Sequence, residues 1–214
     1  MVALLLGTLA ASTLLFSKLA EDVAAGEPIV SLDRTVALGL HTHSTDPATG
    51  LMSAVTQLGG TQALLTVTLA AVLALMAKRR LAHAALMAAA LIGGQALNWA
   101  LKASFERPRP SFSEPLATAA GYSFPSGHAM VSLTVYGALA FVVATSIKSR
   151  RARTAILASA LTLILTIGFS RIYLGVHYVS DVLAAYAAGA AWLSVCALTA
   201  VSVERRDSNP RPPA

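Results

Sequence analysis

The segment 170–181 reads S-R-I-Y-L-G-V-H-Y-V-S-D and lies between two apolar runs. His177 and Asp181 are four residues apart, so both side chains share one face if a helix has already begun there. A carboxylate in that position accepts the Nδ1 proton of the imidazole and leaves Nε2 free as a base, nucleophile or ligand. Arg171, across a turn that Gly175 eases, offers a planar fork that suits an anion. A plain helix end with an interfacial arginine and a surface His–Asp pair is the competing interpretation.

A second polar cluster stands directly before another long apolar run. Residues 121–128 read G-Y-S-F-P-S-G-H. Ser126 or a neighbour would cap the helix that follows, and Gly127 would let the backbone come close to a ligand. A helix N-terminus with free N–H groups, beside a hydroxyl and His128, is suited to binding an anion. The competing interpretation of this cluster is a simple helix cap.

The composition places both clusters in a membrane protein. Of the 214 residues, 56% are apolar and only 12% are charged, which argues against an ordinary soluble globular domain. The stretches without charged residues are near or above the roughly 20 residues that a spanning helix needs. They cover residues 1–17, 47–77, 81–101, 115–147, 154–170 and 182–203. We therefore expect a single all-α domain built as a bundle of six transmembrane helices.

The net charge of +6 comes largely from short basic patches next to the expected spans. The positive-inside rule explains such patches better than nucleic-acid binding does, so we expect no nucleic-acid partner. The patches follow the second, fourth and sixth spans and contain Lys78, Arg79, Arg80, Lys148, Arg150, Arg151, Arg153, Arg205, Arg206 and Arg211. Because all of these lie on one side of the expected bundle, we predict that both termini are cytoplasmic.

The N-terminal 50 residues are expected to lie outside the five-span core. We predict a first span and an extracytoplasmic segment in 1–50, a core with five spans in 51–203 and a cytoplasmic tail in 204–214. No basic residue precedes Lys18, so the charged n-region of a signal peptide is missing and we expect residues 1–17 to be retained as a span. The segment Ile29–Leu40 is apolar apart from Asp33, Arg34 and a few hydroxyls, and we expect it along the membrane surface.

A third basic cluster, K-A-S-F-E-R-P-R-P at residues 102–110, follows the third span on the side that should be poor in lysine and arginine. A topology signal is therefore a poor explanation for Lys102 and Arg109. Because successive spans alternate in direction, four helix ends meet on this face. The polar residues that can converge there are Lys102, Arg109, Ser126, His128, Arg171, His177 and Asp181. Three cations, a helix N-terminus and two histidines describe a site for a phosphoryl group.

These residues resemble the three-part signature of the type 2 phosphatidic acid phosphatases, whose superfamily includes bacterial class A acid phosphatases and vanadium haloperoxidases. The signature stands here as Lys102-x6-Arg109-Pro110, Pro125-Ser126-Gly127-His128 and Ser170-Arg171-x5-His177-x3-Asp181. The resemblance covers roughly residues 50–203 and implies the six-helix, haloperoxidase-like core. Arg107-Pro108 repeats the Arg-Pro pair, but Arg109 has the required separation from Lys102.

The resemblance also implies a catalytic role for each residue. Nε2 of His177 would attack phosphorus and form a phosphohistidine, while Asp181 orients the ring through Nδ1. His128 would protonate the leaving group and then take a proton from the hydrolytic water. The phosphate-binding residues would be Lys102, Arg109, Ser126, Gly127 and Arg171. Because three side-chain cations replace a metal ion, we expect no metal and no cofactor.

The implied activity is that of a lipid phosphatase in the bacterial cytoplasmic membrane, and the charge asymmetry of the chain predicts an active site on the extracytoplasmic side. Phosphatidic acid, phosphatidylglycerophosphate and undecaprenyl diphosphate all present a suitable head group. A non-catalytic lipid-phosphate binder or transporter could use the same basic pocket, but it would not need an activated His–Asp pair facing a second histidine. A vanadate-dependent haloperoxidase would hold vanadate with these residues, but enzymes of that type are soluble.

Overall fold

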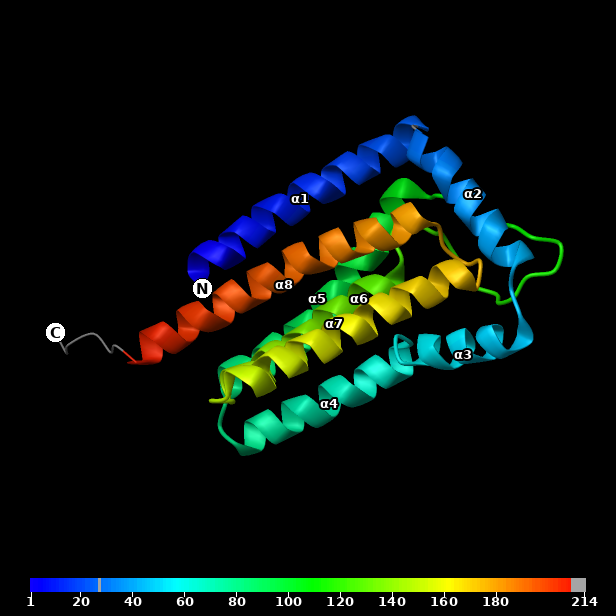
Figure 1. Ribbon diagram of the computed structural model, residues 1–214. Coiled ribbons are helices and arrows are strands. Elements are labelled where there is room, and N and C mark those ends of the chain that lie inside the picture. Colours follow the sequence, from blue (N-terminus) through cyan, green and yellow to red (C-terminus); the bar gives the residue numbers. More distant parts are fainter. Residues whose placement is uncertain (27, 209–214) are drawn as a thin grey trace.

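The computed structural model describes residues 1–26 and 28–208, and every regular element in this part of the chain is an α-helix (Figure 1). In chain order the helices are α1 (Val2–Ala25), α2 (Pro28–Thr42), α3 (Asp46–Gln57), α4 (Thr61–Ala77), α5 (Leu81–Phe105), α6 (Gly127–Thr145), α7 (Arg150–Tyr173) and α8 (Val179–Ser208). The predicted all-α fold is confirmed. Arg211, which we assigned to a basic patch, lies outside the described residues.

Helices α1, α5, α6, α7 and α8 are each long and apolar enough to cross a membrane by length and composition. Helices α3 and α4 meet the same criteria only together, and they are bent by 41° at their junction. Counting the bent pair as one broken span gives six spans within the described residues, compatible with the predicted number. The uncharged run 47–77 therefore forms two helices, α3 and α4, rather than one continuous helix.

The bend between α3 and α4 follows from close packing at Gly59. A Cβ atom on Gly59 would lie 2.5 Å from Cγ2 of Ile167 on α7 and 2.9 Å from Oγ of Ser132 on α6. Only glycine lets the junction approach both helices this closely. The bend brings the end of α3 beside the start of α6.

The N-terminal helices extend beyond the predicted segments, and both pack against α8. Helix α1 continues past residue 17 to Ala25 and carries an ion pair in which Nζ of Lys18 lies 2.7 Å from the Asp22 carboxylate. It runs alongside α8 (Figure 1). The predicted surface segment Ile29–Leu40 lies within α2, which packs against α8 and buries Asp33 and Ala37. Asp33 is therefore an interior residue and not part of a polar outer face.

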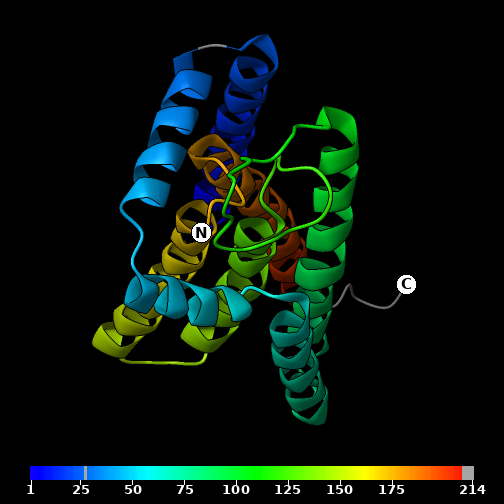
Figure 2. The same cartoon turned by 90° about the vertical axis from the view of Figure 1, so that its right-hand side faces the viewer.

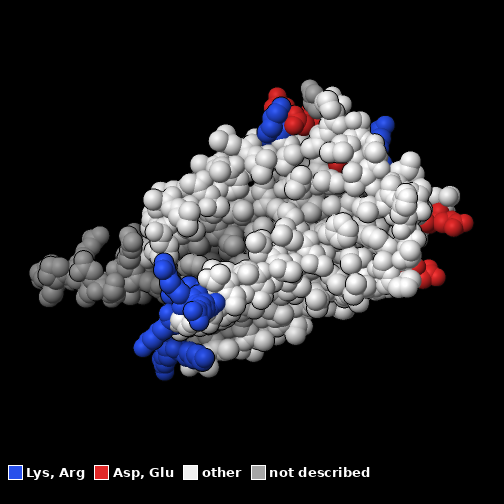
Figure 3. Space-filling model, in the orientation of Figure 1, with Lys and Arg blue, Asp and Glu red and all other residues white. Residues whose placement is uncertain are grey.

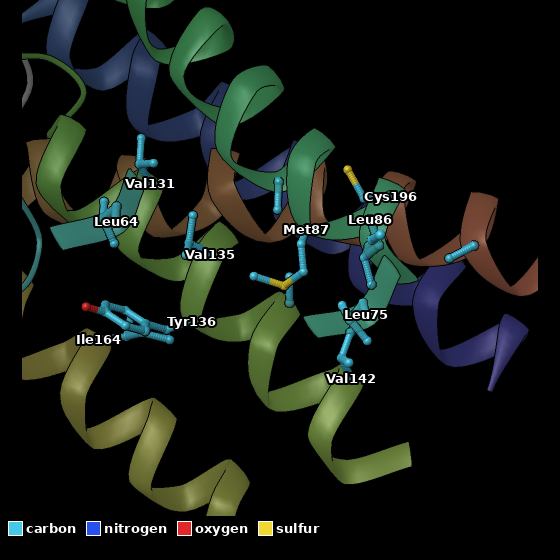
Figure 4. Close-up of a cluster of buried hydrophobic side chains, with 14 of the residues drawn as sticks. Leu64, Leu75, Leu86, Met87, Val131, Val135, Tyr136, Val142, Ile164 and Cys196 are labelled. Carbon is cyan, nitrogen blue, oxygen red and sulfur yellow. The ribbon is translucent and has the colours of Figure 1, made fainter. Parts of the chain in front are cut away.

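Helix α6 occupies the centre of the bundle and contacts α4, α5, α7 and α8 (Figure 2). It is apolar around most of its circumference, as expected for a helix that is covered on several sides. Its side chains Val131, Val135 and Val142 join Leu64 of α4 and Met87 of α5 in the largest hydrophobic cluster (Figure 4). The N-cap of this central helix is the predicted site residue Ser126, and its first turn carries Gly127 and His128, so the core fixes their position.

Helices α7 and α8 approach each other closely where a glycine of α7 faces a tyrosine of α8. A Cβ atom on Gly168 would lie 1.8 Å from the Tyr186 hydroxyl, which donates a 2.9 Å hydrogen bond to the carbonyl of Ile164. The chain then turns between the two helices through Gly175, whose φ is +68°. This left-handed conformation favours glycine.

We expect the substitution Gly168→Ala to destabilise the bundle by about 1–3 kcal/mol, because the added methyl group must push Tyr186 away from Ile164. Thermal unfolding of the purified protein in detergent should show an apparent Tm lowered by several degrees. Gly39→Ala in α2 is the matched control, since no atom apart from the nearby backbone of its own helix lies within 4 Å of its added Cβ. An equal change in both variants would contradict the close-packing argument.

Candidate active site

The predicted site residues meet at one end of the bundle, which faces the viewer in Figure 2. The C-terminal end of α5, the loop 106–126, the start of α6 and the α7–α8 turn surround a cavity of about 480 Å³. Six of the eight predicted residues line this cavity, namely Lys102, Arg109, Gly127, His128, Arg171 and His177. The other two, Ser126 and Asp181, are fully buried beside it.

His177 lies in the turn before α8, because the helix begins at Val179. The two side chains therefore do not share a helix face as the spacing suggested, yet Nδ1 of His177 lies 3.3 Å from Oδ2 of Asp181. The same carboxylate oxygen accepts a 2.9 Å hydrogen bond from the backbone N–H of Tyr178. A carboxylate that bonds to the N–H at the start of its own helix is a familiar capping arrangement, and it fixes the orientation of Asp181.

The hydrogen bonds of His177 determine which ring nitrogen carries the proton. Nη1 of Arg109 lies 3.0 Å from Nε2 of His177, and a guanidinium can only donate. Nε2 is therefore the acceptor, and Nδ1 carries the proton that faces Asp181. Burial lowers the pKa of His177 to about 4, against the opposing effect of the hydrogen bond to Asp181. The ring is neutral near pH 7 and its Nε2 lone pair faces the cavity.

Three cations line the cavity, and their hydrogen-bond acceptors are neutral. Arg109 donates to the carbonyls of Ala120 and Gly121, each at 2.9 Å, and Lys102 donates to the carbonyl of Tyr122. Nη1 of Arg171 donates to the hydroxyl of Thr56 on α3 at 2.8 Å. In the described part of the chain none of the three cations forms an ion pair with a carboxylate. Their combined positive charge is therefore available to an anion.

Ser126 occupies the N-cap position of α6, but its side chain does not cap the helix as we had expected. The Ser126 hydroxyl and Nε of Arg171 are buried and have no hydrogen-bond partner among the described residues. The backbone N–H of Ser126 donates to the carbonyl of Asp181 at 3.1 Å and so joins the start of α6 to α8. The unpaired Ser126 hydroxyl and the unpaired Nε–H of Arg171 suit an oxyanion, which can accept several hydrogen bonds.

Gly127 and His128 form the wall of the cavity at the start of α6. A Cβ atom on Gly127 would lie 2.9 Å from Oδ1 of Asn98, so glycine is required for contact with α5 as well as for access to a ligand. His128 packs against the α3–α4 junction, where a Cβ on Gly59 would be 3.4 Å from its ring. Both histidines thus line the same cavity as the cations.

Sequence reasoning missed two further charged residues and one hydroxyl. Nη1 of Arg107 lies 2.6 Å from Oδ1 of Asp181, and its Nη2 lies 2.8 Å from Oδ2 of Asp33. By its separation from Lys102, Arg107 is only a repeat of the Arg-Pro pair, and Asp33 belongs to the segment that is expected along the membrane surface. Two features of the sequence could have identified them. Asp33 is the single acid in the apolar segment Ile29–Leu40, and Arg107 lies on the side of the membrane that should be poor in lysine and arginine. Thr56, the partner of Arg171, carried no such signal.

The arrangement can bind an oxyanion and present a neutral imidazole nitrogen to it. The described residues contain no group of three or more His, Cys, Asp or Glu side chains that could hold a metal ion. The chemistry that these side chains supply themselves is anion binding, nucleophilic attack and proton transfer.

Comparison with known proteins agrees with this geometry. Residues 82–204 match the model of the PAP2 superfamily. Over 95 residues the chain is 38% identical to phosphatidylglycerophosphatase B of Bacillus subtilis (strain 168), a match that covers 44% of this chain and 46% of that protein. The match therefore spans about half the length of that curated relative.

Two crystal structures share the fold. A transmembrane PAP2 type phosphatidylglycerolphosphate phosphatase from Bacillus subtilis superposes with a TM-score of 0.80 and 26% identity, covering 95% of this chain and 98% of that one. Aquifex aeolicus LpxE superposes with a TM-score of 0.60 and 22% identity, covering 80% of this chain and 95% of that one. Together with the apolar helices, the first similarity identifies this chain as an integral membrane protein.

We expect inorganic phosphate to raise the apparent Tm of the purified protein, because a ligand of the folded state stabilises it by about 2.7 kcal/mol at 100 times its Kd. The substitution Arg171→Gln should remove most of the increase, since Arg171 lines the cavity. Arg153→Gln, an exposed site at the opposite end of α7, is the control, and sodium chloride at matched ionic strength corrects for salt. Equal shifts in both variants would show that phosphate acts elsewhere.

Proposed function

This chain belongs to the PAP2 superfamily, and we propose that it is a membrane-embedded phosphatase that removes phosphate from a lipid head group. The observation that carries the proposal is the neutral His177 ring, whose Nε2 faces a cavity lined by Lys102, Arg109 and Arg171. A protein that only binds phosphate would need the cations but not a nucleophile oriented by Asp181. The names of the Bacillus subtilis relatives support the same activity.

Substrate binding frees the nucleophile. In the structure, Nη1 of Arg109 donates to Nε2 of His177, which occupies the lone pair needed for attack. A phosphate group would draw this N–H to one of its oxygens, and Lys102 and Arg171 would bind the others. The hydroxyl of Ser126 and the N–H of Gly127 would complete the set of donors at the start of α6. Nε2 is then free and opposite the phosphorus atom.

The first chemical step transfers the phosphoryl group to His177. The bond from Nε2 to phosphorus forms as the bond from phosphorus to the leaving oxygen breaks, and the electron pair stays on that oxygen. His128, which takes up a proton once the phosphate anion has entered among the cations, donates that proton to the leaving oxygen. The ring of His177 becomes positively charged, and the carboxylate of Asp181 beside Nδ1 stabilises this charge.

The second step returns the enzyme to its starting state. His128, now neutral, takes a proton from a water molecule as the water oxygen attacks phosphorus. The bond from phosphorus to Nε2 breaks and its electron pair returns to Nε2. Inorganic phosphate leaves, and Arg109 again donates to the neutral ring. Protons balance because His128 loses one in the first step and regains one in the second.

The cavity continues from the cations toward the apolar part of the bundle. Leu64 of α4 and Leu91 of α5 line it together with the exposed Trp99. A lipid phosphate could reach the cations from the bilayer with its chains along α4 and α5, and each buried CH₂ would add about 0.8 kcal/mol. Phosphatidylglycerophosphate, phosphatidic acid and undecaprenyl diphosphate remain the proposed class, and the relatives' names favour the first of these.

The charge distribution supports an extracytoplasmic active site. The basic residues of the α4–α5 and α6–α7 connections gather at the end of the molecule opposite the cavity (Figure 3). By the positive-inside rule that end is cytoplasmic, in the inner membrane of a bacterium. The cavity would then serve the outer leaflet.

We expect His177→Ala to abolish phosphate release from a panel of lipid phosphates, because no other group replaces the nucleophile. His128→Ala should reduce kcat by about 10²-fold or more, as expected for loss of a general acid. Asp181→Asn should be milder than His177→Ala. His43→Ala, an exposed histidine between α2 and α3, is the control and should retain full activity. Near-normal phosphate release by His177→Ala would refute the assigned nucleophile.

We expect a cysteine placed at the exposed Ser113 to react in intact cells or spheroplasts with a thiol reagent that cannot cross membranes. The background should carry Cys196→Ala, which removes the buried native thiol of α8. A cysteine at Ser149, before α7, should react only after the membrane is opened, because that connection is expected in the cytoplasm. The reverse labelling pattern would place the active site in the cytoplasm.

A further inference from the structure

A chain of buried ionisable groups extends from the expected nucleophile to a helix outside the matched family region. His177 contacts Asp181, Asp181 contacts Arg107, and Arg107 contacts Asp33 of α2, at 3.3, 2.6 and 2.8 Å respectively. The side chains of Asp33 and Asp181 are fully buried, and that of Arg107 is 9% exposed. These contacts join α2, the loop 106–126 and α8.

Every polar atom of Asp33 is engaged. Oδ1 accepts a 2.9 Å hydrogen bond from the backbone N–H of Ser180, in the first turn of α8. Oδ2 accepts from Nη2 of Arg107 and from the hydroxyl of Ser180. The Ser180 hydroxyl in turn accepts from Nη1 of Arg107 at 2.7 Å. Three donors, two from Ser180 and one from Arg107, thus fix the position of the Asp33 carboxylate.

Arg107 is enclosed by these groups and does not line the cavity. Its Cζ atom lies 4.3 Å from the centre of the Tyr178 ring, which covers the guanidinium. Arg107 therefore acts on Asp33 and Asp181 and has no contact with the phosphate site. Its role differs in this respect from that of Arg109, two residues later, which faces Nε2 of His177.

The charges of this chain have a consequence for His177. If Arg107 paired with Asp181 alone, the two charges would cancel, and little negative charge would act on the imidazole ring. Asp33 adds a second carboxylate on the far side of the same guanidinium, so the three groups together carry a charge of about −1. That charge lies beside Nδ1, where positive charge develops when Nε2 bonds to phosphorus.

We propose that Asp33 is a positioning residue for phosphoryl transfer, which preserves a net negative charge beside His177 by sharing Arg107 with Asp181. The proposal rests on the proposed function, in which His177 is the nucleophile. By this proposal α2 contributes a residue that affects the rate of phosphoryl transfer, although the matched family region begins at residue 82. A purely structural contact between α2 and α8 is the alternative that the experiment must separate.

The test compares steady-state kinetics of three purified variants on one lipid phosphate, with thermal unfolding of each. Asp33→Asn removes the charge and retains the shape, so kcat should fall about tenfold or more while KM changes less than about twofold. Asp33→Asn combined with Arg107→Gln removes one negative and one positive charge and restores the net −1 at Asp181. Its kcat should therefore exceed that of Asp33→Asn. Asp22→Asn, the same substitution at an ion pair of α1, should match the wild type.

Each outcome decides the matter. A structural contact predicts that the double variant is no faster than Asp33→Asn, and that result would overturn the proposal. A folded Asp33→Asn variant with wild-type kcat would do the same. If Asp33→Asn alone does not yield folded protein, the double variant is compared directly with the wild type. A kcat within about tenfold then supports the proposal, and a larger loss rejects it.

The same measurements separate failure of this inference from failure of the proposed function. If the wild type releases phosphate and His177→Ala does not, while Asp33→Asn is fully active, then only the role of Asp33 is wrong. If His177→Ala remains active, the nucleophile is wrong, and the Asp33 kinetics no longer concern a phosphohistidine.

Discussion

The mutual repulsion of three cations shapes the end of the bundle where the cavity lies. Lys102, Arg109 and Arg171 can stay close together only if other contacts hold each of them in place. Those contacts are neutral, since backbone carbonyls of the loop 106–126 hold Lys102 and Arg109 and a hydroxyl of α3 holds Arg171. Carboxylates at the same positions would relieve the repulsion but would compete with a phosphate for every cation. The loop 106–126 therefore supplies the backbone carbonyls that hold Lys102 and Arg109 in place.

The features that could be predicted from the sequence are those that a local pattern determines. Uncharged runs marked most of the spans, and the alternation of spans brought Lys102, Gly127 and His177 to one end. Features that depend on packing between distant segments could not be predicted. The bend at Gly59 arises from contact with α6 and α7, which no local pattern records. Asp33 likewise looks like the polar side of a surface helix until α2 is packed against α8.

The segments before residue 82 contribute directly to the candidate site. Thr56 of α3 holds Arg171, Asp33 of α2 holds Arg107, and α1 lies along α8 and supports its position. The matched family region contains all of the signature residues, but Thr56, which holds Arg171, and Asp33, which holds the Asp181 partner Arg107, lie outside it. Recognition of the signature identifies the reacting groups, whereas the N-terminal helices help to determine how those groups are oriented.

The hydrogen bonds that the cations make also bear on how the catalytic cycle ends. Arg109 donates to Nε2 of His177, to three carbonyls of the loop 106–126 and to the carbonyl of Val176, and Lys102 donates to one carbonyl. A phosphate that binds Arg109 must displace some of these partners, so its affinity is lower than an unengaged Arg109 would give. Inorganic phosphate carries the same charged oxygens as the substrate but lacks the lipid chains. The protein acceptors compete with inorganic phosphate for Arg109 and Lys102, and so they favour release of this product. The lipid chains of the substrate add apolar binding free energy that inorganic phosphate lacks, so the next substrate molecule can replace the product.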